Sequence, residues 1–408
     1  MNERLRPYAL VLSLVVLSAP LACDSDEPKR PGSQGGAAGN SGPVAGTAGA
    51  AQGGVNSASG ASAGGASAGS TLAGASSAGS AGEASSGGAG AEGGDQGAGG
   101  APPITEPRVL PTTGAIKDVH DPFIVKDGGT YYLFSTGDGV SVRTSPDLLT
   151  WESAGRVFAS KPSWITTTAN NGTSNHLWAP EVRYFGGKFH LYYSASSFGS
   201  NDSCIGHATR SSLSSGAGWV DDGQAVLCSK DGQDDYNAID PAPFEDESGK
   251  LWLAFGSFWS GLKLIRLSAD GRRDGPDLFA LSTRPHPPGA VEAPQLIHHD
   301  GFYYLFESVD ACCKGVDSTY KMMVGRSASV SGPYLDKAGD ALLADRAGTL
   351  LLEGDDRYRG PGHNAILVDG NRYYNVYHAY DANDAGAPYL RIADLIWGDD
   401  GWPITAGP

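Results

Sequence analysis

A short sequence pattern recurs five times beyond residue 118. Each copy places a polar functional group next to a proline or short turn and then continues into an apolar run; a turn and an aromatic-rich strand follow. The copies begin at residues 119, 177, 238, 291 and, in a weaker form, 362. A small sheet of such strands cannot bury both faces alone, whereas sheets packed around an axis can. The repeat therefore predicts an all-β, five-bladed β-propeller whose first strands line the axis.

The chain divides into three regions of different composition. Residues 1–23 combine early positive charges with a short apolar run, which predicts an export signal. Residues 24–108 are mostly Gly, Ala and Ser and contain no Phe, Trp or Tyr. We expect a disordered tether there, because so little apolar surface cannot offset the entropy of folding. Residues 109–408 carry the repeats and form the predicted propeller domain.

The end of the export signal resembles that of a bacterial lipoprotein, because small residues precede Cys23. We expect Cys23 to carry a lipid that anchors the exported protein at the cell envelope. Pro20 stands where Leu is usual, and ordinary secretion is the alternative. The apolar run is too short to span a bilayer, so contact with a membrane is expected only through the lipid.

The formal net charge of −16 at pH 7 restricts the class of partner. A nucleic-acid binder needs a basic face that displaces counterions from phosphate, and this chain is strongly acidic. The charge is compatible with a neutral ligand. We expect a monomer whose ligand carries no net charge.

The remaining cysteines form two pairs in the sequence. Cys204 and Cys228 are spaced for a conventional disulfide in an oxidising compartment. Cys312 and Cys313 are adjacent, and they are either two buried thiols or a vicinal disulfide. A vicinal disulfide would strain the peptide between them, and such strain is usually retained at a functional site.

Three carboxylates occupy nearly equivalent places in three of the repeats. Asp121 and Asp240 precede a proline, and Glu292 lies one residue earlier in its repeat. Burying three unpaired carboxylates without a functional reason is costly. A carboxylate cluster in a site for a neutral ligand predicts glycoside hydrolysis, in which one group is a protonated acid and another is ionised. Aromatic residues near the motifs are candidates for stacking on sugar rings: Trp178, Phe258 and Trp259.

The domain resembles glycoside hydrolase family 43 and, within it, the endo-arabinanases, which are arabinan endo-1,5-α-L-arabinosidases. The resemblance covers residues 119–404. The motifs that carry it are His120-Asp121-Pro122, Leu177-Trp178-Ala179-Pro180-Glu181, Asn237-Ala238-Ile239-Asp240-Pro241, Gly256-Ser257-Phe258-Trp259-Ser260-Gly261, Val291-Glu292-Ala293-Pro294, the segment from Cys312-Cys313 to Tyr320, and Gly360-Pro361-Gly362-His363-Asn364.

The resemblance implies an inverting mechanism that cleaves α-1,5-linked arabinan. Asp121 would be the general base, Glu292 the general acid and Asp240 the residue that tunes the pKa of the acid and orients it. Inversion requires the acid and base carboxyls to lie roughly 6.5–9.5 Å apart. His363 would help to hold an axial metal ion, often calcium. By the same resemblance Cys312 and Cys313 would form a vicinal disulfide at the wall of the cleft.

The resemblance also extends the set of expected substrate contacts. These residues are Trp178, Asn237, Ser257, Phe258, Trp259, Cys312, Cys313 and Tyr320. Two alternatives to an endo-arabinanase remain at this stage. One is an exo-acting arabinofuranosidase or β-xylosidase of the same family. The other is a non-catalytic, carbohydrate-binding propeller at the cell surface, which would have no reason to keep all three carboxylates.

Overall fold

The computed structural model describes residues 104–165, 175–286 and 289–408. The predicted export signal, Cys23 and nearly all of the predicted tether lie outside these residues. Within the described ranges, no helix has the length and apolar character needed to cross a membrane.

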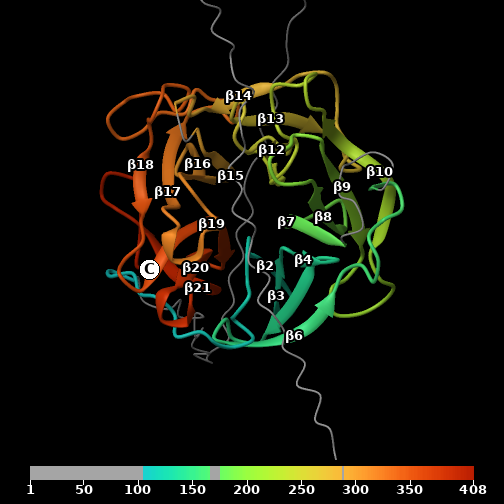
Figure 1. Cartoon of the computed structure of the whole chain (residues 1–408), viewed down its shortest axis with the longest axis horizontal. Helices are drawn as coiled ribbons and strands as arrows, with labels where there is room; N and C mark the ends of the chain where they lie inside the picture. Colours follow the sequence, from blue (N-terminus) through green and yellow to red (C-terminus); the bar gives the residue numbers. More distant parts are fainter. Residues whose placement is uncertain (1–103, 166–174, 287–288) are drawn as a thin grey trace, which may run out of the picture. The chain divides into compact units, whose positions relative to one another are not determined.

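Five sheets surround a common centre, which confirms the predicted five-bladed β-propeller (Figure 1). Blade 1 contains β2 (Phe123–Asp127), β3 (Thr130–Ser135), β5 (Ser141–Ser145), β6 (Thr150–Arg156) and, at its outer edge, β1 (Thr113–Gly114). Blade 2 contains β7 (His176–Phe185), β8 (Lys188–Ala195), β9 (Ser203–Arg210) and β10 (Val220–Ser229), with β4 (Gly137–Asp138) paired to β7.

The other three blades each have four antiparallel strands. Blade 3 contains β11 (Ala242–Glu245), β12 (Leu251–Phe255), β13 (Leu262–Leu267) and β14 (Phe279–Ser282). Blade 4 contains β15 (Val291–His299), β16 (Phe302–Val309), β17 (Lys321–Ser327) and β18 (Thr349–Leu352). Blade 5 contains β19 (Tyr358–Asp369), β20 (Arg372–Asp381), β21 (Ala387–Trp397) and β22 (Pro403–Thr405). Two short 3₁₀ helices, η1 (Gly315–Asp317) and η2 (Ala382–Asp384), lie in loops.

The turn after the inner strand of each blade depends on glycine. At least one glycine in each of these hairpins has a positive φ, which glycine adopts without steric cost. These residues are Gly128, Gly187, Gly249, Gly301 and Gly370. The turn sends the chain back along an aromatic-rich second strand, so every repeat in the sequence becomes one hairpin of a blade.

The apolar core lies between the faces of neighbouring blades. Leu133 and Trp151 of blade 1, for example, pack in one cluster with Val376 and Ile392 of blade 5. Equivalent clusters join blades 1 and 2, 2 and 3, 3 and 4, and 4 and 5. Packing around the axis therefore buries both faces of each sheet, as the repeat pattern requires.

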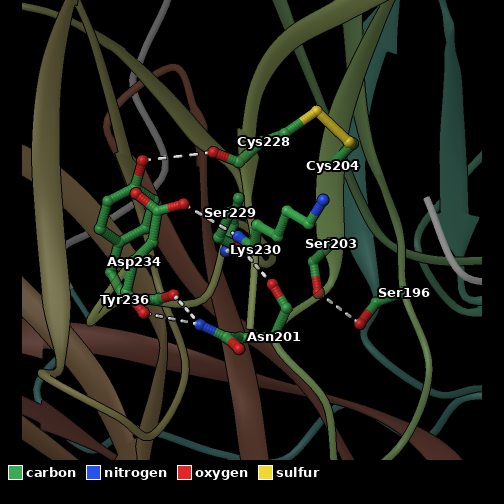
Figure 2. Close-up of a disulfide and its surroundings, with 10 residues drawn as sticks. Ser196, Asn201, Ser203, Cys204, Cys228, Ser229, Lys230, Asp234 and Tyr236 are labelled. Carbon is green, nitrogen blue, oxygen red and sulfur yellow. Dashed lines mark hydrogen bonds between the residues drawn. A yellow bond between two sulfur atoms is a disulfide. The ribbon is translucent and has the colours of Figure 1, made fainter. Parts of the chain in front are cut away.

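Cys204 and Cys228 form a disulfide between β9 and β10, with an S–S distance of 2.04 Å. Figure 2 shows the polar contacts that continue from it into the loop after β10. The Tyr236 hydroxyl donates to the carbonyl oxygen of Cys228. In addition, Ser229 Oγ accepts from the backbone N–H of Ala238. The disulfide thus lies beside the loop that leads to Asp240.

Residues 108–119 link the last blade to the first. The backbone N–H of Leu110 donates to the carbonyl of Ile392 (2.8 Å), and that of Asp394 donates to Arg108 (2.9 Å). The same segment then supplies β1, which pairs in parallel with β6 of blade 1. We call residues 108–119 the closing segment, because it connects blade 5 to blade 1 through backbone hydrogen bonds.

A buried carboxylate between blades 3 and 4 makes stability depend on pH. Glu307 on β16 is fully buried, and neither carboxylate oxygen has a hydrogen-bond partner of good geometry within the described residues. Burial, only partly opposed by Ser282 and Arg284, raises the pKa of Glu307 to about 7. A raised carboxylate pKa stabilises the fold below the pKa of the unfolded chain, and this contribution is lost as the pH rises through about 7.

We expect Glu307→Gln to raise the free energy of unfolding at pH 8 and not at pH 4.5. The gain is on the order of 3 kcal/mol at most, since each pKa unit corresponds to about 1.4 kcal/mol. Urea unfolding at both pH values measures it. The control is Glu152→Gln, the same change at an exposed position. The same free energy of unfolding for wild type and Glu307→Gln at pH 8 would contradict the expectation.

Candidate active site

One residue at the axial start of each blade has a left-handed backbone. These residues and their φ angles are Asp121 (51°), Ala179 (44°), Asp240 (57°), Ala293 (55°) and His363 (49°). Such angles cost on the order of 1–3 kcal/mol for a residue other than glycine and persist mainly at functional sites. In β7, β15 and β19 the residue lies within a β-bulge, a feature that re-aims side chains.

A ring of hydrogen bonds connects these five residues to the neighbouring blades. Each backbone N–H donates to a side chain of the preceding blade. The bonds run from Asp121 to His378 Nδ1 (3.2 Å), from Ala179 to Thr136 Oγ1 (2.7 Å), from Asp240 to Ser194 Oγ (3.0 Å), from Ala293 to Asp240 Oδ2 (3.1 Å) and from His363 to Ser308 Oγ (2.8 Å). We call this set the axial ring. These bonds hold the start of each inner strand against a side chain of the preceding blade.

Asp121 is surrounded by hydrogen-bond donors. Its Oδ1 lies 2.8 Å from His120 Nδ1 and 3.1 Å from His363 Nδ1, and its Oδ2 accepts from Thr136 Oγ1 (2.5 Å). Burial alone would raise the pKa of Asp121, but the charges and hydrogen bonds of His120 and His363 hold it well below its usual range. Asp121 is therefore ionised at neutral pH, as a general base must be.

A second layer of contacts fixes His120. Its Nε2 lies 2.7 Å from the Tyr380 hydroxyl, which also accepts from the backbone N–H of Cys313 (2.9 Å). The ring of His120 stacks on that of His378, with the centroids 3.9 Å apart. Burial opposes protonation of His120, yet Asp121 and Cys313 raise its pKa well above its usual value. His120 therefore holds Asp121 as a charged partner.

Glu292 and Asp240 form the opposite part of the site. Ser257 Oγ donates to Glu292 Oε2 (2.7 Å), and Asp240 Oδ2 accepts from the backbone N–H that follows Glu292. Burial raises the pKa of Asp240 to about 8; His363 lowers it, while the negative charges of Glu292 and Asp121 add to the increase. Asp240 therefore keeps a proton at neutral pH next to Glu292.

A small axial cavity lies between the blades beside this site. Its walls include Asp121, Asp240, Glu181, His363 and Asn364. Both carboxylate oxygens of Glu181 accept from Gln295 Nε2 (3.1 Å each), which crosses from blade 4 to blade 2. Burial raises the pKa of Glu181 to about 8. The Trp-Ala-Pro-Glu motif contains this residue, but no role followed from the sequence.

The predicted aromatic contacts differ in exposure. The Trp178 ring lies 5.0 Å from that of Phe198, which is 66% exposed, and Trp259 is 40% exposed. Phe198 was missed because it lies in the loop after β8, away from every repeated motif. Phe258 is partly buried beside Trp259. A partly buried Trp178 beside the exposed Phe198 suits stacking on a sugar ring.

Two other predicted contacts, Asn237 and Tyr320, are buried. Asn237 is 3% exposed, and its Oδ1 has no hydrogen-bond partner within the described residues. Tyr320 is 2% exposed and packs against Gly362, where a Cβ would lie 2.0 Å from the ring. Burial and the nearby charge of Glu292 raise the pKa of the Tyr320 hydroxyl well above its usual value. Tyr320 thus forms a wall behind the acid rather than an open platform.

The structure does not join Cys312 to Cys313 in a disulfide, and both residues are partly buried. Cys313 Sγ lies 3.7 Å from His120 Nε2. A contact with Cys313 lowers the pKa of Cys312, but burial and the charges of Glu292, Asp121 and Asp240 raise it to about 11. The vicinal disulfide at the wall of the cleft therefore stays a prediction.

The geometry separates two chemical roles. An ionised carboxylate, Asp121, is held by histidines and a hydroxyl, whereas Asp240, next to Glu292, retains a proton. Environments that push the pKa values of neighbouring acids apart identify a general base and a general acid. A glycan-cleaving site needs this combination.

Comparison with known proteins supports this interpretation. The model of glycosyl hydrolases family 43 matches residues 115–403, which is most of the chain. The chain belongs to glycosyl hydrolase family 43. Relatives of known activity are similar over the same region. An extracellular endo-α-(1→5)-L-arabinanase of Bacillus subtilis is 46% identical over 289 residues, covering 70% of this chain and 87% of that protein.

One further relative differs in its described mode of action, and two solved structures are similar to the whole propeller. An extracellular exo-α-(1→5)-L-arabinofuranosidase of Cellvibrio japonicus is 39% identical and covers 70% of this chain and 86% of that protein. Among solved family 43 structures, an endo-arabinanase from Bacillus licheniformis has a TM-score of 0.68 and 46% identity, covering 72% of this chain and 99% of that one. A Cellvibrio cellulosa α-L-arabinanase complexed with arabinohexaose has a TM-score of 0.68, 38% identity and coverage of 71% and 96%.

Proposed function

We propose that this family 43 member is an inverting endo-hydrolase of α-1,5-linked arabinan. The observation that carries the proposal is the separation of roles in the site: Asp121 is held ionised, while Asp240, which binds the backbone next to Glu292, keeps a proton. The activities of the arabinanase relatives add the substrate class.

On the base side, Asp121 removes a proton from the attacking water. Both contacts to its Oδ1 come from histidines, so Oδ2 is the oxygen that faces the water. The water then attacks the anomeric carbon from the face opposite the leaving oxygen, which inverts the configuration.

On the acid side, Glu292 donates a proton to the leaving glycosidic oxygen. Ser257 holds one carboxylate oxygen of Glu292, which leaves the other to carry the proton. Asp240 fixes the backbone directly after Glu292 and keeps its own proton at neutral pH, because burial raises its pKa to about 8. Its proposed role is to position the acid and to tune the pKa of the acid, as the family resemblance implies.

Product analysis tests the proposal. The full-length protein is incubated with linear α-1,5-arabinan while chain length and anomeric configuration are followed over time. A mixture of oligosaccharides that shortens progressively, with inverted reducing ends, is expected. Retained configuration, or binding without cleavage, would contradict the proposal and favour a different mechanism or a carbohydrate-binding propeller.

Exo action is the second candidate, because one relative is described as an exo-acting arabinofuranosidase. An exo enzyme would release a single short product from the start of the reaction, with little early change in chain length. The same time course therefore distinguishes the two modes.

We also propose a calcium ion in the axial cavity, with His363 as a ligand. Asn364 Nδ2 donates to Asn375 Oδ1 (2.9 Å), which leaves the buried Asn364 Oδ1 without a partner within the described residues. Carboxylates of Asp121, Asp240 and Glu181 line the same cavity. Oxygen ligands of this kind fit a hard cation. A bound cation supplies positive charge that offsets repulsion among these carboxylates.

Chelation with EDTA is therefore expected to lower Tm, and added calcium to restore it. A ligand at 100 times its Kd stabilises a fold by about 2.7 kcal/mol. His363→Ala should remove most of this calcium dependence. His286→Ala, at an exposed histidine, is the matched control and should keep it. A wild-type Tm that does not respond to calcium or chelator would overturn the proposal.

Export with a lipid anchor at Cys23 is proposed from the sequence, and the two arabinan-cleaving relatives above are described as extracellular. Cys23→Ser is expected to move the enzyme from the membrane fraction into the soluble fraction, because no lipid can be attached. The control is Ser25→Ala, which leaves Cys23 intact. Wild-type protein that is already soluble after export would show ordinary secretion instead.

A further inference from the structure

We propose that Thr136 is a positioning residue that fixes the general base and connects it to blade 2. The inference rests on the proposed function, in which Asp121 activates water. The neighbouring motifs gave no indication of this role, because Thr136 lies at the end of β3 and outside every repeated pattern.

Three hydrogen bonds hold Thr136. Its backbone N–H donates to the carbonyl of His120 (3.0 Å), so the residue is tied to the turn that carries Asp121. Its Oγ1 accepts from the backbone N–H of Ala179 (2.7 Å) and lies 2.5 Å from Asp121 Oδ2.

These contacts fix the direction of the third bond. The N–H of Ala179 can only donate, so Thr136 Oγ1 accepts there. The hydroxyl proton must then point elsewhere, and its partner is Asp121 Oδ2. This carboxylate oxygen therefore accepts the bond with one lone pair and keeps the other for the attacking water. Hydrogen bonds to a charged acceptor are stronger than neutral ones.

The other blades show why this arrangement is particular to blade 1. Gly256 occupies the equivalent place in blade 3, since its N–H donates to Ile239, the residue before Asp240. Ser194 and Ser308 accept from inner-strand N–H groups as Thr136 does, but within the described residues neither donates to a carboxylate. Thr136 alone among these ring hydroxyls combines the structural bond with a contact to the base.

Removal of the hydroxyl should affect chemistry more than binding. In Thr136→Val a methyl group replaces Oγ1, and because carbon–oxygen contacts need about 3.3–3.6 Å, Asp121 must move by about 1 Å. A displacement of this size can lower the rate by about 10²-fold. Thr136→Ala removes the bond without the displacement, and we expect about a 10-fold loss. Thr136→Ser retains the hydroxyl and should keep most of the activity.

The experiment measures kcat, KM and Tm for these three variants on linear arabino-oligosaccharides. A second substrate, an aryl arabinoside with a nitrophenol leaving group, reports on the base alone because it needs little acid assistance. We expect kcat to fall by the same factor on both substrates, with KM nearly unchanged. Thr150→Val, the same change at an exposed position, should match wild type.

Three outcomes would overturn the role of Thr136. Wild-type kcat in both Val and Ala variants would show that the contact is dispensable. An equal loss in the Ser variant would assign the effect to packing of the methyl group. A loss confined to the natural substrate would place the defect on the acid. Failure of the proposed function is distinguishable, because wild-type protein would then cleave neither substrate. If Thr136→Val does not fold, the Ala and Ser variants still decide the question.

Discussion

Asp121→Asn is expected to lower kcat on α-1,5-arabinan by about 10²- to 10⁴-fold, the range that general base catalysis contributes. The amide has nearly the shape of the carboxylate but cannot take a proton from water. KM should change little, because the substitution removes no contact that binds the sugar or the leaving group. The loss should be equally large with a nitrophenyl leaving group, because water activation is needed for every substrate.

The pH profile gives a second test of the base. Asp121 is held ionised by His120 and His363, and its pKa lies well below the usual range. The acid limb of wild-type activity should therefore lie below pH 4, the ordinary pKa of an aspartate. The control Asp356→Asn changes a fully exposed aspartate and should leave kcat and Tm unaltered. A kcat within threefold of wild type in Asp121→Asn would show that another group is the base.

Glu292→Gln is expected to produce a loss of similar size on arabinan but a much smaller loss on the nitrophenyl substrate. The natural leaving group is an alkoxide that must be protonated, whereas nitrophenolate leaves without help. This contrast separates the acid from the base, because the base variant loses both activities. Glu152→Gln, at an exposed position, serves as the control.

Glu292→Gln should also change the alkaline limb of the pH profile. The acid must be protonated to act, so wild-type activity is expected to fall on the alkaline side, where the acid loses its proton. The residual activity of Glu292→Gln should lack this limb, because glutamine has no proton to lose. An alkaline limb that persists unchanged in the variant would assign it to a different group.

The five-bladed fold could be predicted from the sequence because each blade contains its own copy of the repeated pattern. The inner strand follows a polar residue and proline, and the glycine turn and aromatic strand come next, so five local patterns define five sheets. The carboxylates Asp121, Asp240 and Glu292 could be identified for the same reason: each lies inside a repeat. Their roles as base, modulator and acid required the family resemblance.

The rest of the site depends on contacts between blades. Thr136 and Phe198 lie at the end of a second strand and in a loop, so no repeated pattern marks them. Glu181 meets its partner Gln295 across 114 residues of sequence, and His378 reaches Asp121 across 257. Such long-range pairs become visible only when the ring of blades is assembled.

The closing segment has a consequence for how the ring opens. The sheets inside the blades are paired along whole strands, but residues 108–119 meet blade 5 through single backbone bonds and bridges, including those of Leu110, Ile116 and Val119, and meet blade 1 through the short β1. Segments held by scattered bonds rather than by a continuous strand ladder open at a lower free energy than the rest of a fold. Amide hydrogen exchange at Leu110 and Asp394 should therefore be faster than in β20 or β16, and global unfolding should begin by separation of blade 1 from blade 5.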